Sequence, residues 1–292
     1  MEGLLVKGYG GFYYVDDGKR LWACSLRGRF RVRKQVFLPG DRVEFLVVDD
    51  ARQTGVVEAV LPRRNELLRP PVANMDQVVV VLAAVDPKPD LWLLDRLLMM
   101  IRTAGADPVI CFNKRDLDPE GLSELVGIYE PAGFRMAVTS TVTGFGLDGL
   151  REIMKDRTTV FAGPSGVGKS SLLNALETNL RLKTGEISAK LGRGKHTTRH
   201  VELLALSFGG WVADTPGFSQ IYLPEKVKAA DLAELYPDFR PYTDQCQFAS
   251  CLHRGEPVCG VRAAAEDGRL DSGRYERYRM FLDEALSRER RY

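Results

Sequence analysis

The sequence predicts an α/β protein with three parts: a central parallel-sheet domain, a small all-β barrel before it, and a small, mainly helical metal-binding domain after it. Three observations predict this. Apolar and polar residues alternate through much of 3–60, strand-like and helix-like segments alternate from residue 77 onward, and three cysteines with one histidine lie within 246–259. We place the domain boundaries at 1–70, 71–222 and 223–292.

In the first 60 residues, apolar and polar side chains alternate in short segments that turn-forming residues separate. A period of two residues is that of a strand with one buried face. Several such segments in succession predict a small barrel, here of the oligonucleotide-binding (OB) type. The segments are 11–15, 20–24, 41–48 and 54–60.

A basic cluster lies inside this barrel region. Arginine alternates with smaller or apolar residues over 27–33, which predicts a strand with its guanidinium groups on one face. One interpretation is a solvated strand face. The other is an RNA-binding face, because phosphate contacts and ring stacking are what OB barrels supply. The RNA-binding candidates are Arg27, Arg29, Arg31, Arg33 and Lys34.

The central domain begins after Arg69-Pro-Pro71, because two prolines interrupt a strand ladder or a helix. The run Gln77–Ala84 is almost wholly apolar, which is typical of a strand covered on both faces of a parallel sheet. Further strands are predicted at 108–112, 134–139 and 158–162, and helices at 91–102 and 119–130. In such a sheet, ligands bind at the carboxyl ends of the strands.

A glycine-rich loop follows the predicted strand 158–162 and matches the phosphate-binding pattern GxxxxGKS. Its backbone N–H groups can converge on phosphate oxygens at a helix N-terminus. Lys169 can reach the β- and γ-phosphates, and the Ser170 hydroxyl can bind Mg²⁺. The expected phosphate-site residues are Gly163, Pro164, Ser165, Gly166, Val167, Gly168, Lys169, Ser170 and Ser171.

The base is predicted to be guanine. Asn113-Lys114-Arg115-Asp116 follows the strand 108–112, and the Asp116 carboxylate can accept hydrogen bonds from guanine N1–H and the 2-amino group. Adenine lacks both donors, so Asp116 argues against an ATPase or a metabolite kinase. Ser140 and Thr141, after the strand 134–139, can present backbone N–H groups to the guanine O6.

Two later segments are expected to complete the magnesium site. Asp214-Thr-Pro-Gly217 supplies a second acid and a backbone N–H for the γ-phosphate, and Thr198 or Thr197 can bind the metal when that phosphate is present. His196 is the candidate for orienting the attacking water, although it could instead only stabilise its loop. The catalytic candidates are His196, Lys169 and Thr198, and the expected Mg²⁺ ligands are Ser170, Thr198 and Asp214.

The base-reading motif precedes the phosphate loop, which is the order of a circularly permuted GTPase. With the barrel before it and the cysteines after it, the chain resembles the ribosome small-subunit-dependent GTPase family (RsgA, also called YjeQ) over nearly its whole length. The quoted motifs and Arg69-Pro-x-x-x-Asn74-x-Asp76 carry the resemblance. It implies GTP hydrolysis stimulated by the ribosome, GTP or GDP bound with Mg²⁺, and binding to the 30S subunit and its 16S rRNA late in 30S maturation.

The cysteine-rich region predicts one structural Zn²⁺. Cys246, Cys251, His253 and Cys259 form a Cys₃His set, the donor set of a closed tetrahedral site, and no nearby general base suggests catalysis. A region of about 70 residues has little core of its own, so a metal would stabilise it. Cys24 and Cys111 lie in strand-like runs and are expected in the core.

The composition and the length of the apolar runs indicate where in the cell the protein acts, and an alternative function remains open. The chain has 41 basic and 39 acidic residues, and its longest apolar run, 78–85, is far below the roughly 20 residues of a membrane helix. We therefore expect a cytoplasmic protein that contacts no membrane, and a monomer. The alternative to a ribosome-stimulated GTPase is an RNA-binding assembly factor that uses GTP mainly as a structural ligand.

Overall fold

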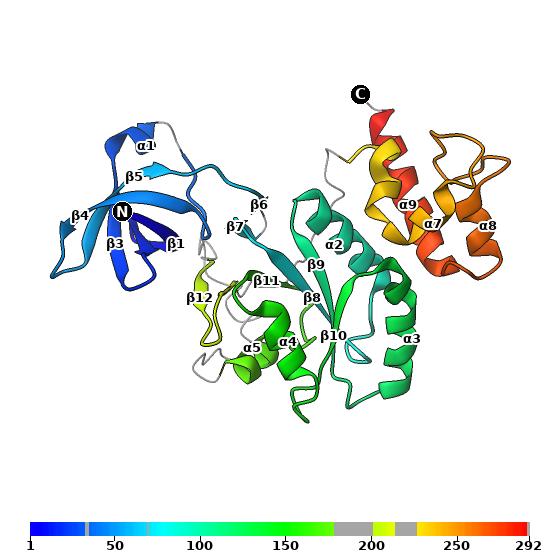
Figure 1. Ribbon diagram of the computed structural model, residues 1–292, viewed down its shortest axis with the longest axis horizontal. Coiled ribbons are helices and arrows are strands. Elements are labelled where there is room, and N and C mark those ends of the chain that lie inside the picture. Colours follow the sequence, from blue (N-terminus) through cyan, green and yellow to red (C-terminus); the bar gives the residue numbers. More distant parts are fainter. Residues whose placement is uncertain (33–34, 69, 178–200, 214–226, 291–292) are drawn as a thin grey trace, which may run out of the picture.

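The computed structural model describes all residues except 33–34, 69, 178–200, 214–226 and 291–292. The described residues form a β-barrel, a six-stranded α/β domain and a C-terminal helical region, in that chain order (Figure 1). In this part of the chain, no helix combines the length and the apolar character that crossing a membrane requires.

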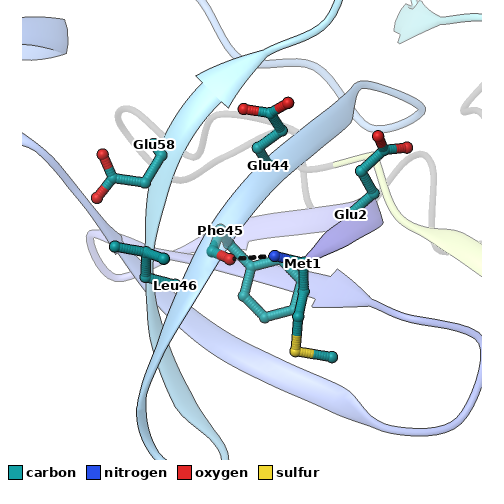
Figure 2. Close-up of a pocket in the computed structure, with 6 residues that line it drawn as sticks. All are labelled: Met1, Glu2, Glu44, Phe45, Leu46 and Glu58. Carbon is teal, nitrogen blue, oxygen red and sulfur yellow. Dashed lines mark hydrogen bonds between the residues drawn. The ribbon is translucent and has the colours of Figure 1, made fainter.

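The barrel closes in the strand order β1-β2-β3-β5-β4. Only β3 and β5 pair in parallel. Its core contains Trp22 and Phe45, whose rings lie 5.8 Å apart, and the Met1 ammonium donates to the Phe45 carbonyl at 2.9 Å (Figure 2). The elements are β1 Glu2–Tyr9, β2 Phe12–Asp16, β3 Leu21–Leu26, α1 Gly28–Val32, β4 Arg42–Asp49 and β5 Thr54–Val60.

The alternation of arginine over 27–33 predicts a strand, and this prediction is wrong. The segment forms the short helix α1 instead. Phe30 explains the difference. It is buried and packs edge-on against Phe37, with ring centroids 5.3 Å apart, so one turn of helix seals an end of the barrel. Burying one aromatic ring from this connection outweighs the local alternation, which by itself favours an extended segment.

A two-stranded hairpin, β6 Glu66–Leu68 and β7 Pro71–Ala73, joins the barrel to the α/β domain. The expectation that the two prolines interrupt a strand ladder is wrong at Pro71, which pairs with Leu68. Pro71 is the first residue of a strand in a sheet of two, where a missing N–H donor is tolerated.

Asn74 and Asp76, the last two named residues of the Arg69-Pro-x-x-x-Asn74-x-Asp76 motif, make hydrogen bonds that stabilise this junction. The Asn74 amide donates to the Gly40 carbonyl of the barrel at 2.8 Å and accepts from the Arg64 N–H at 2.8 Å. Asp76 accepts from the Thr158 N–H at 2.7 Å, at the first residue of β11. Their role in this structure is therefore to position the barrel and the linker against the sheet.

The central sheet has the order β10-β9-β8-β11-β13-β12 and is parallel except for β12. Alternate residues of β8 enter two cores, one with α2 and α3 and the other with α4 and α5, which gives three layers. The elements are β8 Gln77–Ala83, α2 Leu91–Thr103, β9 Asp107–Asn113, α3 Pro119–Tyr129, η1 Glu130–Ala132, β10 Arg135–Val138, α4 Leu147–Met154, β11 Thr158–Ala162, α5 Lys169–Leu176, β12 Leu203–Ala205 and β13 Trp211–Ala213.

The C-terminal region packs its helices around a small aromatic core in which Phe239 lies 4.8 Å from Tyr278, centroid to centroid. Met99 of α2 belongs to the same core, so this region is joined to the α/β domain through α2 (Figure 1). Its elements are η3 Ala229–Leu235, η4 Pro237–Phe239, α7 Arg240–Thr243, α8 Gly260–Glu266 and α9 Ser272–Glu289.

Candidate functional site

The loops that carry the nucleotide motifs leave the same edge of the sheet. Strands β10, β9, β8 and β11 are parallel neighbours, so their carboxyl ends lie side by side. The segment 113–116 begins at the last residue of β9, and the segments 139–145 and 163–168 follow β10 and β11 directly. The topology therefore brings together motifs that lie about fifty residues apart in the chain, as the sequence predicted.

Two glycines of the phosphate loop have conformations and neighbours that exclude side chains. Gly163 has φ +129°, and a Cβ atom there would lie 2.2 Å from the Val81 carbonyl oxygen of β8. Gly168 has φ +96°, and a Cβ atom there would lie 2.5 Å from Nδ2 of Asn113. Gly168, the residue before α5, has no side chain that could cap the helix, so no capping side chain of its own competes with an anion at this N-terminus.

Lys169 lies within the curve of this loop. Its Nζ donates to the carbonyls of Gly163 at 2.8 Å and Pro164 at 2.7 Å, and the residue is almost fully buried. These bonds place the ammonium group where phosphate oxygens would approach. Ser170 is half-buried at the start of α5, where its hydroxyl can reach a metal ion on the phosphates.

Asn113 ties the base-reading turn to the phosphate loop. Its Nδ2 donates to the Val167 carbonyl at 2.9 Å, and its Oδ1 accepts from the Thr139 hydroxyl at 3.1 Å. Asn113, Thr139 and Val167 are all buried. The Thr139 hydroxyl therefore fixes which way the Asn113 amide points. No motif in the sequence marks this role, because Thr139 stands just before the recognised Ser140-Thr141 pair.

The Ser140 hydroxyl holds the base-reading acid. It donates to Oδ1 of Asp116 and accepts from the Val142 and Thr143 N–H groups at 3.3 and 3.2 Å. The Ser140 N–H itself donates to the Phe145 carbonyl at 3.0 Å. The turn thus uses the Ser140 N–H in this structure, and the contacts of the Ser140 and Thr141 N–H groups with guanine O6 stay predictions.

Several predicted residues lie outside the described part of the chain. They are His196, Thr197, Thr198, Asp214 and Gly217, together with Arg33 and Lys34 of the basic cluster. The expected catalytic histidine and two of the three expected Mg²⁺ ligands therefore stay predictions. Of the set proposed for Mg²⁺, the structure describes Ser170.

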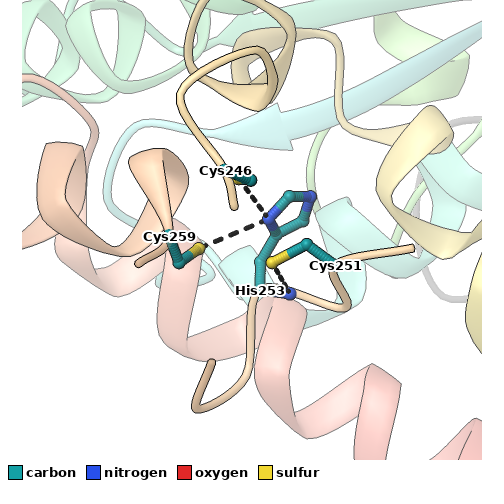
Figure 3. A group of neighbouring side chains, drawn as sticks. All are labelled: Cys246, Cys251, His253 and Cys259. Atoms are coloured by element: carbon teal, nitrogen blue, oxygen red, sulfur yellow. Dashed lines mark hydrogen bonds between the residues drawn. The ribbon is translucent and has the colours of Figure 1, made fainter. Parts of the chain in front are cut away.

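The four predicted metal ligands converge (Figure 3). One donor atom each from Cys246, Cys251, His253 and Cys259 lies within 4.8 Å of the other three. His253 Nδ1 is 3.5 Å from the Cys246 sulfur and 3.4 Å from the Cys259 sulfur. Ligands about 2.0–2.3 Å from a tetrahedral ion stand about 3.5–3.8 Å apart, so this donor set fits a metal such as zinc.

The surrounding groups hold this cluster in place. Tyr275 and Tyr278 of α9 donate their hydroxyls at 2.8 Å to the carbonyls of His253 and Leu252. Burial raises the pKa of Glu256, but backbone N–H donors, including those of residues 252, 254 and 255, outweigh burial and bring it to about 2. The ionised carboxylate thereby fixes the loop between the ligands.

Two residues of the proposed RNA face can be placed. Arg27 and Arg29, at half-exposed positions, both pair with Glu58 of β5. Glu58 also lines a shallow hollow of about 370 Å³ with Glu2 and Glu44, which Figure 2 shows on β1 and β4. The side of the barrel beside the basic helix is therefore partly acidic, which the alternation in the sequence did not indicate.

The fold and the site define a class: a phosphate-loop GTPase domain in circularly permuted order, because a guanine-type turn at 113–116 precedes the phosphate loop at 163–170 in one parallel sheet. Family models described as RsgA N-terminal domain and RsgA GTPase match residues 2–57 and 60–224. The chain belongs to the RsgA GTPase family and is a GTP-hydrolysing enzyme, as the resemblance had indicated.

Individual relatives are similar in sequence to this chain over its whole length. The chain is 50% identical to the small ribosomal subunit biogenesis GTPase RsgA of Moorella thermoacetica, with all of both chains aligned. It is 47% identical to the protein of that name from Alkaliphilus metalliredigens, over all of this chain and 99% of the other.

Two solved structures share the fold. The crystal structure of YjeQ from Thermotoga maritima superposes with a TM-score of 0.81 at 36% identity, covering 98% of both chains. YloQ, described as a circularly permuted GTPase, superposes at 0.79 with 38% identity, covering 98% of this chain and 95% of that one. The predicted fold class is thereby confirmed.

Proposed function

We propose that this protein hydrolyses GTP with Mg²⁺ in the biogenesis of the small ribosomal subunit, and that the subunit stimulates the reaction. The observation that carries this proposal is the Asp116 carboxylate, which Ser140 holds beside a phosphate loop, in a chain that relatives of that name match from end to end. A role on the ribosome also implies a cytoplasmic location. We also propose that the protein acts as a monomer and that its three domains comprise residues 1–70, 71–222 and 223–292.

The test is GTP turnover with and without isolated 30S subunits. We expect turnover to rise steeply when subunits are added, and ATP to be hydrolysed far more slowly than GTP. Equal turnover in both conditions would favour the alternative in which GTP is mainly a structural ligand. A matched variant, His196→Ala, is expected to lose most of the stimulated rate and keep its GTP affinity, because the proposed role of His196 is to orient water.

We propose that Ser170, Thr198 and Asp214 hold the Mg²⁺ and that Lys169 and Thr198 act on the γ-phosphate. When bound, the metal neutralises charge that builds on the phosphate oxygens. This chain contributes Lys169 to the same task, supported by the two loop carbonyls that place its ammonium group. Ser170→Ala is expected to weaken Mg²⁺-dependent nucleotide binding without a change in fold.

We propose that the ion in the Cys₃His cluster is zinc and that it is structural. The closed four-ligand set and the two tyrosine hydroxyls that hold the ligand loop support this. Metal analysis should give about one zinc per chain for the wild type, and Cys251→Ser should lose it. Cys24→Ala, in the barrel core, is the control and should keep the metal.

We propose that the barrel contacts 16S rRNA through the face of Arg27 and Arg29, extended by Arg31, Arg33 and Lys34. Removing one phosphate contact should weaken 30S binding and lower its salt dependence by about one unit of slope. Arg29→Gln is the test. Arg52 is an exposed arginine on the β4–β5 turn that pairs with Asp49. The Arg52→Gln variant is the control and should bind 30S subunits as the wild type does.

A further inference from the structure

We propose that helix α2 transmits nucleotide occupancy to the metal-bearing C-terminal region, and that Asp95 is the residue that couples the two. The proposal needs only guanine nucleotide binding and is independent of any ribosomal partner. It rests on contacts of the connection that leads into α2, on the division of α2 between two cores, and on a buried charge cluster at Asp95.

The first step is the connection from β8 to α2, which is bonded to the base-reading turn and lies near the phosphate loop. Lys114 Nζ, in the base-reading turn, donates to the Asp86 carbonyl. Pro87 Cδ lies 3.7 Å from the position of a Cβ atom on Gly166, in the phosphate loop. Because a guanine nucleotide engages both loops, binding acts on the connection that leads into α2.

The second step is α2 itself, whose residues divide between two cores. One face, with Leu94, Leu97 and Leu98, packs against the central sheet. A stripe at helical spacing, with Trp92, Asp95, Arg96 and Met99, faces the C-terminal region instead. Since one rigid helix carries both sets of residues, a shift of its N-terminal end must also move the stripe that faces the C-terminal region.

The third step is the contact that Asp95 makes. Its carboxylate is fully buried and accepts from Arg274 at 2.6 Å, from Arg277 at 2.6 Å and from the Tyr129 hydroxyl at 2.9 Å. Arg274 also donates to Asp238 at 2.6 and 3.1 Å. The two arginines of α9 thus face the acids Asp95 and Asp238, and Arg277 also lies 4.0 Å from Asp271. Tyr129 approaches the cluster from α3.

Such a cluster responds sharply to displacement. Separating a buried ion pair leaves charges without partners, at a much higher cost than sliding one apolar surface over another. The structure shows the bonded arrangement, and a displacement of α2 is expected to break the cluster rather than to stretch it gradually. That is the behaviour of a switch rather than of a passive joint.

The fourth step leads to the metal cluster. Arg274 begins a stretch of α9 in which the neighbouring Tyr275 and Tyr278 donate to the carbonyls of His253 and Leu252. The ligand loop is thus bonded to the same helix that Asp95 holds. Within the described residues, a path therefore runs from the base-reading turn, through the Lys114–Asp86 bond, α2 and α9, to the loop that carries the metal ligands.

Hydrogen–deuterium exchange of the zinc-loaded, full-length protein tests the proposal, with and without a non-hydrolysable GTP analogue. In the wild type, we expect nucleotide to change the exchange of α9 amides by about fivefold or more, the lower range of typical coupling factors. Asp95→Asn should abolish this change while calorimetry shows nucleotide affinity within about threefold of the wild type.

Two further variants make the result decisive. Tyr129→Phe removes one donor to Asp95, keeps the ring, and should reduce the response even if Asp95→Asn does not fold. Glu284→Gln, which breaks the Arg96 pair at the same interface outside the cluster, should respond as the wild type does. The proposal is overturned if wild-type α9 ignores nucleotide, if folded Tyr129→Phe responds fully, or if Glu284→Gln loses the response.

Discussion

Gly168→Ala tests how the phosphate loop and the base-reading turn depend on each other. The added methyl group would lie 2.5 Å from Asn113 Nδ2, at a residue with φ +96°. The left-handed backbone costs about 1–2 kcal/mol for a residue with a Cβ atom. Pushing the Asn113 amide away leaves the buried Val167 carbonyl without its donor, at about 1–3 kcal/mol. We expect a total loss of about 2–5 kcal/mol of folding free energy and weaker GTP binding.

Urea unfolding at 25 °C measures this loss, and a double-mutant cycle separates its two causes. In an Asn113→Ala background the clash is absent, so only the backbone cost of about 1–2 kcal/mol should remain. Gly149→Ala in α4, where no atom lies within 4 Å of the new methyl group, is the control and should stabilise by about 0.5–1 kcal/mol. A Gly168→Ala cost that is the same in both backgrounds would refute the clash with Asn113.

Three further outcomes are expected. Asp116→Asn should lower GTP affinity by at least about tenfold and raise affinity for xanthine nucleotides, measured by calorimetry; unchanged GTP affinity would remove Asp116 from base recognition. Lys169→Ala should reduce hydrolysis at least about a hundredfold with an unchanged unfolding midpoint, whereas a shifted midpoint would make the lysine a structural residue. Burial raises the pKa of Cys24 to about 11 and of Cys111 to about 12, so a thiol reagent at pH 8 should label only the three cluster cysteines, and only after chelation. Labelling of Cys24 or Cys111 in the folded protein would contradict that burial.

The sequence by itself determined the class of protein because its signals are local. The glycine-rich loop and the Cys₃His spacing each lie within one short segment, and the chemistry of phosphate and metal binding restricts which residues can occur there. The order of the motifs along the chain is also a property of the sequence alone. From these the circular permutation and the expected metal cluster could be predicted.

Tertiary structure decided the features that depend on distant partners. The alternation over 27–33 predicted a strand, but burial of Phe30 against Phe37 made the segment a helix. Asp95 is followed directly by Arg96 in the sequence, but in the structure Arg96 pairs with Glu284 of α9. The partner of Asp95 is Arg274, which lies 179 residues further along the chain. A charged residue inside an apolar helical run was the one signal of this cluster. The sequence could not supply the partner, because the cost of burying a charge is met only where folding brings the opposite charge to it.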